Sequence, residues 1–129
     1  MRLLLLLLGL AGAFTAPSAV AQEDQAKQVY VPVSPLQAPI MRAGRIYRQI
    51  RMNINLEATP GAAESRTRDM MPRLQTAYQK ALLDYVQRRM RPRKAPDIAA
   101  IADRMQVATD RILGPDIARV RIDNVAIIR

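Results

Sequence analysis

The sequence predicts a small α+β domain in which a short antiparallel or mixed sheet is covered on one face by two helices. Three observations lead to this fold class. A long run alternates between apolar and polar residues, two later segments carry apolar residues at helical spacing, and a second alternating run closes the chain. Strands this far apart in sequence, joined by two helices, form a layered domain with the helices on one side of the sheet.

The N-terminal segment, residues 1–21, is expected to direct export and to lie outside the folded domain. Arg2 precedes an apolar stretch over residues 3–14, and a small-x-small triplet ends at Ala21. This order is typical of a secretory signal that is cleaved after Ala21. Residues 3–21 carry no charge and approach the roughly 20 residues that span a bilayer, so a retained membrane anchor is the alternative. With either outcome we expect the rest of the chain to be exported.

Residues 22–43 are predicted to form an extended, proline-rich spacer, and residues 44–129 the folded domain. Residues 22–28 are polar and charged, which favours a flexible tail. Pro32, Pro35 and Pro39 follow, and proline fixes φ and removes a backbone donor. This stretch is therefore either polyproline-like or a short edge strand around residues 29–33.

The first long strand is predicted over residues 45–57, RIYRQIRMNINLE. Its even positions are apolar except for Arg48, and its odd positions are mostly polar or charged. Side chains alternate across a strand, so the even side is expected to lie beneath the helices. The odd side faces water or, alternatively, an oligomer partner or another protein. The candidate partner face consists of Arg45, Tyr47, Gln49, Arg51 and Asn53.

A first helical segment is predicted over residues 62–90, after a turn at Thr59, Pro60 and Gly61. Its apolar residues recur at steps of three and four, as in an amphipathic helix. Pro72 lies inside the segment. The helix begins either at Asp69 with Pro72 in its first turn, or near Ala62 with a kink at the proline. We expect the kink.

A second helix is predicted over residues 97–113, with Gly114 and Pro115 as its stop signal. Its apolar residues follow a 3-4-3-4 spacing. This spacing also occurs in coiled-coil seams, but the segment is short and packing onto the sheet is the expected use.

The turn between the two helices is strongly basic. It contains a run of cations beside a helix C-terminus, where positive charge is favoured. One interpretation is a solvated turn that complements the helix dipole, and the other is a patch that binds an anion or a partner. The candidate patch consists of Arg88, Arg89, Arg91, Arg93 and Lys94.

The last strand is predicted over residues 118–129. Val120 and Ile122 share one phase of the alternation, whereas Val125 and Ile127 share the other. An extra residue switches the faces of a strand, so we predict a bulge at Asp123 and Asn124. Removal of even a short C-terminal piece is expected to unfold the domain.

The composition excludes several kinds of chemistry. The chain has no Cys and no His, which excludes the usual zinc sites and Ser-His or Cys-His nucleophiles. No recognisable catalytic pair occurs among the mid-chain carboxylates Glu57, Glu64, Asp69 and Asp84. We therefore expect a protein that is not an enzyme and that needs no cofactor and no metal.

The formal net charge is +9, from 20 Lys and Arg and 11 Asp and Glu. For an exported basic protein we expect anionic lipid, cell-wall polymer or an acidic protein surface as the partner. Zinc fingers and aromatic RNA-binding motifs are missing from the sequence, so no nucleic-acid partner is expected.

The order of these segments resembles the periplasmic region of the flagellar basal-body-associated FliL family. The likeness spans about residues 30–129. It is carried by IYRQIRMNINLEA (46–58), MPRLQTAYQKALLDY (71–85), DRILG (110–114) and VRIDNVAII (120–128). The chain departs from the family in the short segment before its leucine run and in its closing residues Ile127, Ile128 and Arg129.

The resemblance implies a stomatin/SPFH-like fold and a role without catalysis at the flagellar motor. Members of the family are thought to form rings around the stator units and to support motility. The implied partners are further copies of the chain, flagellar stator proteins and inner-membrane lipid. The implied location is the periplasm, at the flagellar basal body.

Overall fold

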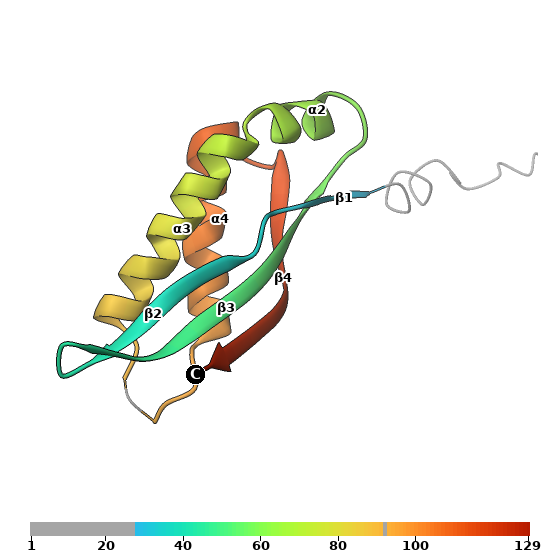
Figure 1. The fold of residues 1–129 in the computed structure, drawn as a ribbon. Coiled ribbons are helices and arrows are strands. Elements are labelled where there is room, and N and C mark those ends of the chain that lie inside the picture. The colour runs from blue at the N-terminus through green and yellow to red at the C-terminus, as the bar shows by residue number, and fades with distance from the viewer. Residues whose placement is uncertain (1–27, 92) are drawn as a thin grey trace, which may run out of the picture.

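The computed structural model describes residues 28–91 and 93–129. The predicted signal or anchor, residues 1–21, lies outside them. Figure 1 shows the elements, which follow the order β1 (Val29–Pro32), β2 (Leu36–Arg42), β3 (Arg45–Ala58), α2 (Ala62–Asp69), α3 (Met71–Arg88), α4 (Ile98–Leu113) and β4 (Ala118–Ile128). The predicted α+β class is confirmed, with a small antiparallel sheet of four strands and three helices.

The longest strand, β3, lies at the centre of the sheet. β1 and β2 pair one after the other along one edge of β3, and β4 pairs along the other edge, all antiparallel. The side of β3 that was predicted to be apolar is buried, since Ile50, Met52, Ile54 and Leu56 are at most 2% exposed. Alternation over this stretch thus identified the core face of the sheet.

The edge strand that was one alternative for residues 29–33 is present as β1, whereas β2 was not expected, and together they replace the predicted extended spacer. The side chains Val31, Val33, Leu36 and Ala38 of this stretch are buried in the core. The prolines are compatible with pairing because the two strands lie on an edge, where a missing N–H leaves no partner unsatisfied. The prolines suggested a spacer, whereas the alternating apolar residues between them belong to an edge strand.

α3 and α4 lie side by side over the same face of the sheet, α3 along β2 and α4 along β4 (Figure 1). The other face carries no element of the described chain. The helical segment begins at Ala62 as expected, but in place of a kink at Pro72 the segment breaks at Met70 into α2 and α3, and Pro72 lies in the first turn of α3 as in the other alternative. α2 turns away and crosses one end of the molecule.

α4 begins and ends within one residue of its prediction. The Asp97 side chain accepts a hydrogen bond from the Ala100 N–H at 3.1 Å, which satisfies one free donor of the first turn. Gly114 ends the helix with a φ of 97°. Arg66 of α2 donates to the Leu113 carbonyl at 3.0 Å, so a cation also satisfies the C-terminal end of α4.

The predicted bulge in β4 is confirmed. Asn53 pairs with Asn124 and Ile54 with Ile122, so Asp123 is the extra residue. Val120 is buried, Ile122 and Val125 are half-buried against the core, and the bulge explains the change of phase along the strand.

A second bulge, in β3, was not predicted. Ile40 pairs with Arg48 and Met41 pairs with Ile46, which leaves Tyr47 as the extra residue. The phase of β3 therefore changes at Tyr47. Ile46 is 62% exposed as a result, and its predicted burial beneath the helices is wrong.

Glutamine side chains from the helices hydrogen-bond to both edges of the sheet. On the β2 side, Gln75 donates to the Ser34 carbonyl at 3.1 Å and Gln79 donates to the Gln37 carbonyl. On the β4 side, Gln106 donates to the Ala118 carbonyl and accepts from the Val120 N–H, each at 2.9 Å. Prolines on one edge and a bulge on the other are further features that disfavour the addition of another strand.

Candidate interaction site

The basic turn lies at one end of the molecule, between α3 and α4. Its first cation, Arg88, is in the last turn of α3, where it pairs with Asp84 at 2.8 Å, and Asp84 also contacts Arg104 at 3.3 Å. The other four cations of the turn, Arg89, Arg91, Arg93 and Lys94, are exposed. Among the described residues no ion pair involves them. These four are therefore available to an anionic partner.

A buried tyrosine of α3 holds the end of the basic turn that leads into α4. The Tyr85 hydroxyl accepts a hydrogen bond from the Asp97 N–H at 2.8 Å, and Tyr85 is 5% exposed. Asp97 in turn caps α4. Both ends of the turn are therefore fixed by helices, which limits how far its cations can move.

The β2–β3 hairpin extends to the same end. Its two turn residues, Ala43 and Gly44, have φ values of 51° and 76°, and positive φ at both positions is the requirement of a type I′ turn. Met41 and Ile46 pair across the hairpin and are 49% and 62% exposed. The hairpin tip thus presents an apolar pair to the surroundings.

Cations flank this apolar pair and contact the adjacent aromatic ring. The guanidinium carbons of Arg42 and Arg48 lie 5.5 and 5.0 Å from the centre of the Tyr47 ring. These distances allow cation–π attraction. Arg42 and Arg45 are paired directly opposite each other beside the turn.

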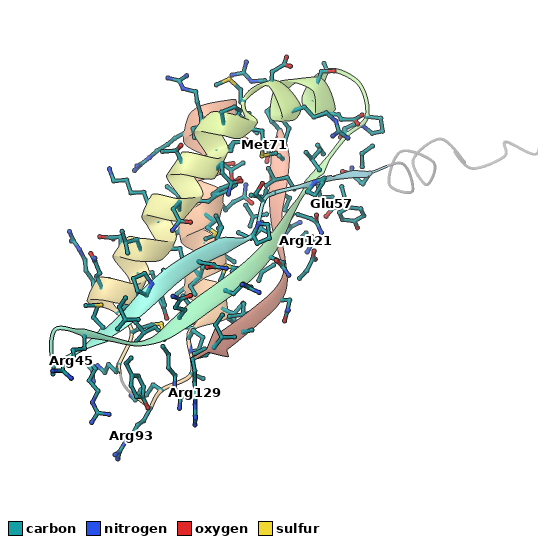
Figure 2. All side chains as sticks on the ribbon, in the orientation of Figure 1. Arg45, Glu57, Met71, Arg93, Arg121 and Arg129 are labelled. Carbon is teal, nitrogen blue, oxygen red and sulfur yellow. The ribbon has the colours of Figure 1, made fainter. Side chains whose placement is uncertain are left out.

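The hairpin and the basic turn meet in a hollow of about 250 Å³. Its apolar lining includes Ile40, Met90 and Ile127 from three different elements of the chain. Its remaining lining consists of Tyr47, Arg48, Arg91, Arg93, Lys94 and Ala95. Figure 2 labels Arg45, Arg93 and Arg129 at this same end of the molecule. We call this surface the basic end: hairpin residues 41–48, turn residues 88–91 and 93–95, and the last residues 127–129.

The structure divides the predicted partner face of β3 between two surfaces. Arg45 and Tyr47 belong to the basic end, close to the turn that was predicted as a separate site. Gln49, Arg51 and Asn53 lie further along β3 on the uncovered face of the sheet, where Arg51 is exposed and the other two are half-buried. This remaining face is polar, and Arg121 of β4 pairs across it with Glu57 at 2.7 Å.

Sequence reasoning missed the contribution of Arg42, Arg48 and Arg129 to the basic end. The available signal was the segment MRAGRIYR, residues 41–48, in which arginines alternate with apolar residues around an Ala-Gly turn. This signal becomes informative only once β2 is recognised as a strand that pairs with β3.

Three of the four mid-chain carboxylates form ion pairs with arginine side chains. Glu57 pairs with Arg121, Glu64 with Arg68, and Asp84 with Arg88 and Arg104. Within residues 28–91 and 93–129, no group of three acidic, His or Cys side chains is placed to hold a metal ion.

Comparison with protein-family models, with curated proteins and with solved structures finds no match to this chain. In the part of the chain that the structure describes, no helix combines the length and the apolar character needed to cross a bilayer.

Proposed function

We propose that the protein is a non-enzymatic interaction protein of the bacterial flagellar basal body, related to the FliL family, that assists the motor stator from the periplasm. The observation that supports it best is the one-sided layering. α3 and α4 occupy one face of the sheet, whereas no element of the described chain covers the other face. From β3 onward, the order of strand, helices and closing strand is the one on which the family likeness rests.

The protected edges favour a particular mode of contact. Gln75, Gln79 and Gln106 occupy backbone groups on the two edges of the sheet, so another chain has little opportunity to add a strand. Copies of the protein and stator subunits are therefore proposed to contact the uncovered face, around Arg51 and Asn53, and not the edges.

The test is deletion of the gene in a flagellated host, followed by measurement of swimming and of swarming on soft agar. We expect reduced motility that the wild-type gene restores. A complementing gene with Asn53→Arg, which places a bulky cation on the uncovered face, is expected to restore motility poorly. The matched control is Gln87→Arg, since Gln87 is an exposed residue of α3. Normal motility of the deletion strain would contradict the proposal.

A second candidate function is the binding of anionic lipid or cell-wall polymer by an exported module. The convergence of hairpin and turn cations at the basic end favours it. Replacement of Arg88, Arg89, Arg91, Arg93 and Lys94 by Gln is then expected to abolish sedimentation with anionic vesicles or with cell-wall sacculi at low salt. Sedimentation that is equal to that of the wild type would reject this function.

A further inference from the structure

Exposed apolar side chains gather at the basic end. Met41, Ile46, Tyr47 and Ile127 are exposed by 49, 62, 44 and 37%, and they come from the hairpin and from the end of β4. These apolar side chains contribute nothing to a basic patch that is only solvated, because exposed apolar area is unfavourable in water. Their position among cations indicates a partner that has both an anionic surface and an apolar interior.

The charge at this end is one-sided. Seven cations surround the apolar side chains without taking part in any ion pair found among the described residues: Arg42, Arg45, Arg48, Arg89, Arg91, Arg93 and Lys94. The carboxylates nearest along the chain are already engaged: Glu57, after the hairpin, pairs with Arg121, and on either side of the turn Asp84 pairs with two arginines and Asp97 caps α4. Charge complementarity therefore requires an anionic partner.

We propose that the basic end docks onto the surface of a bilayer that contains anionic phospholipid. Met41 and Ile46 enter the boundary between headgroups and acyl chains, and the surrounding cations contact lipid phosphates. This inference deepens the second candidate function, on which it rests, by naming the bilayer as the partner and the hairpin as the part that enters it. Burial of apolar side chains together with attraction of cations to anionic lipid is the combination that holds peripheral proteins at membranes.

The shape of the basic end favours a bilayer over the other anionic partners. A soluble polyanion or a cell-wall polymer attracts the cations but offers no apolar medium for Met41 and Ile46. An acidic protein would need a matching concave surface, because the two-residue turn makes the hairpin tip convex. A fluid headgroup region accommodates a convex tip without such a match.

The hollow between hairpin and turn provides a place for a headgroup phosphate. Its lining combines the cations Arg48, Arg91, Arg93 and Lys94 with the apolar side chains Ile40, Met90 and Ile127. A phosphate held by these cations would have its glycerol and acyl chains beside apolar residues. The same orientation brings the hairpin tip toward the bilayer.

The experiment measures binding of the full exported protein to vesicles by flotation. Vesicles of phosphatidylglycerol and phosphatidylcholine in equal parts are compared with vesicles of phosphatidylcholine alone. We expect binding only to the anionic vesicles, and weaker binding at high salt. The double variant Met41→Ser/Ile46→Ser, which retains every cation, is expected to lose at least about tenfold in apparent affinity. The variant Arg91→Gln/Arg93→Gln/Lys94→Gln is expected to lose more, since each cation near an anionic surface contributes on the order of fivefold.

Matched controls lie away from the basic end. Val107→Ser removes an exposed apolar side chain of α4 that is 51% accessible, and Arg73→Gln removes an exposed cation of α3. Neither is expected to change vesicle binding. Thermal unfolding of each variant, followed by circular dichroism, shows whether a loss of binding reflects a loss of folding.

Two outcomes overturn the proposal. If the wild-type protein does not bind anionic vesicles but binds an acidic protein, the basic end is a protein-binding surface. A Met41→Ser/Ile46→Ser variant that binds vesicles as tightly as the wild type makes it a purely electrostatic polyanion site. Binding of the same variant to soluble polyphosphate is measured in parallel and is expected to remain unchanged.

A second readout uses fluorescence. The chain has no Trp, so Tyr47→Trp introduces a single reporter whose emission is expected to shift to the blue with anionic vesicles. An unshifted spectrum at saturating lipid would also overturn the proposal. Motility of a Met41→Ser/Ile46→Ser strain separates this inference from the flagellar role. Vesicle binding tests the inference and motility tests the flagellar role, so one result can be negative while the other is positive.

Discussion

A single buried hydroxyl pair links the two long helices. Tyr78 of α3 and Thr109 of α4 are both fully buried, and their oxygens are 2.6 Å apart. Thr109 donates its own proton to the Met105 carbonyl at 2.7 Å, so Tyr78 is the donor to Thr109. Burial of the phenol raises the pKa of Tyr78 to about 12. Ionisation of Tyr78 would place a charge in the buried region between α3 and α4, which disfavours the folded state.

Alkaline pH is expected to weaken the fold through Tyr78. Its pKa is raised from 10.0 to about 12, so the stabilisation is complete below pH 10 and is lost as the pH rises toward 12. The complete loss corresponds to about 2–3 kcal/mol of unfolding free energy, since one pKa unit is about 1.4 kcal/mol. About half of this loss, roughly 1.4 kcal/mol, has occurred at pH 11, and urea unfolding at pH 8 and at pH 11 measures that part.

Tyr78→Phe is the control for this pH dependence, because other tyrosines and lysines also titrate in the same range. The variant is expected to be less stable at pH 8 by about 0.5–1.5 kcal/mol, the usual contribution of a hydrogen bond. It is also expected to lose less stability between pH 8 and 11 than the wild type. Equal losses would mean that Tyr78 does not carry the effect.

At the scale of elements, side chains of the helices complete the sheet. Gln106 of α4 hydrogen-bonds to a carbonyl and to an N–H of β4 that point away from β3. Gln75 and Gln79 of α3 do the same for two carbonyls on the opposite edge. Helix and strand are thus joined by directional hydrogen bonds as well as by apolar packing.

Gln106→Ala is expected to lower the unfolding free energy by about 1–3 kcal/mol. The substitution leaves the Val120 N–H and the Ala118 carbonyl without their partner, which is costly for half-buried backbone groups. Hydrogen exchange followed by NMR should show a larger increase in exchange rate at Val120 than at Leu56 in the central strand. A variant with wild-type stability and wild-type exchange at Val120 would contradict this role.

Ala43→Asn is expected to stabilise the hairpin by about 1 kcal/mol. Ala43 has a φ of 51°, a conformation that is unfavourable for an ordinary L-residue and better tolerated by Asn. Thermal unfolding measures the gain, and Ala95→Asn, in the exposed turn, is the matched control. A lower melting temperature for Ala43→Asn would show that the turn does not strain Ala43.

The elements differ in how far the sequence predicts them, for physical reasons. α4 carries its own cap and stop signals, and the β4 bulge is visible as a change of phase between Ile122 and Val125. β1 was predicted only as one of two alternatives and β2 was not predicted as a strand, because three prolines mask their alternation. The β3 bulge has only Arg48 as a sequence signal, a single polar residue on the apolar side, so the exposure of Ile46 could not be predicted.

The candidate site was predicted in parts and not as a whole. The cations of residues 88–94 stand out as a run in the sequence. Their proximity to Tyr47 and Arg48 depends on the pairing of β2 with β3, which brings residues about 45 positions apart to one end of the molecule. Long-range pairing of this kind leaves no local trace in the sequence.

At the scale of the whole molecule, the start of the described chain and the basic end lie at opposite ends of the central strand. β1 pairs with the last residues of β3, whereas the hairpin turn precedes its first residue. The 14 residues of β3 at a rise of about 3.3 Å each separate the two ends by roughly 40 Å. Residues 22–28 reach at most about 24 Å when fully extended, which is shorter than this separation.

With a retained N-terminal anchor, the basic end therefore reaches the anchoring membrane only when β3 is tilted well away from the membrane normal. With β3 upright, residues 22–28 are too short to bring the basic end back to that membrane, and it would face a second one. Full-length protein reconstituted into anionic vesicles distinguishes the two orientations: clustering of vesicles in dynamic light scattering indicates the upright one, and vesicles that stay dispersed indicate the tilted one. Clustering that persists with Met41→Ser/Ile46→Ser would show that the basic end does not bridge the vesicles. In the upright orientation, the number of residues in one β-strand would set the width of the gap between two apposed lipid surfaces, in steps of about 3 Å per residue.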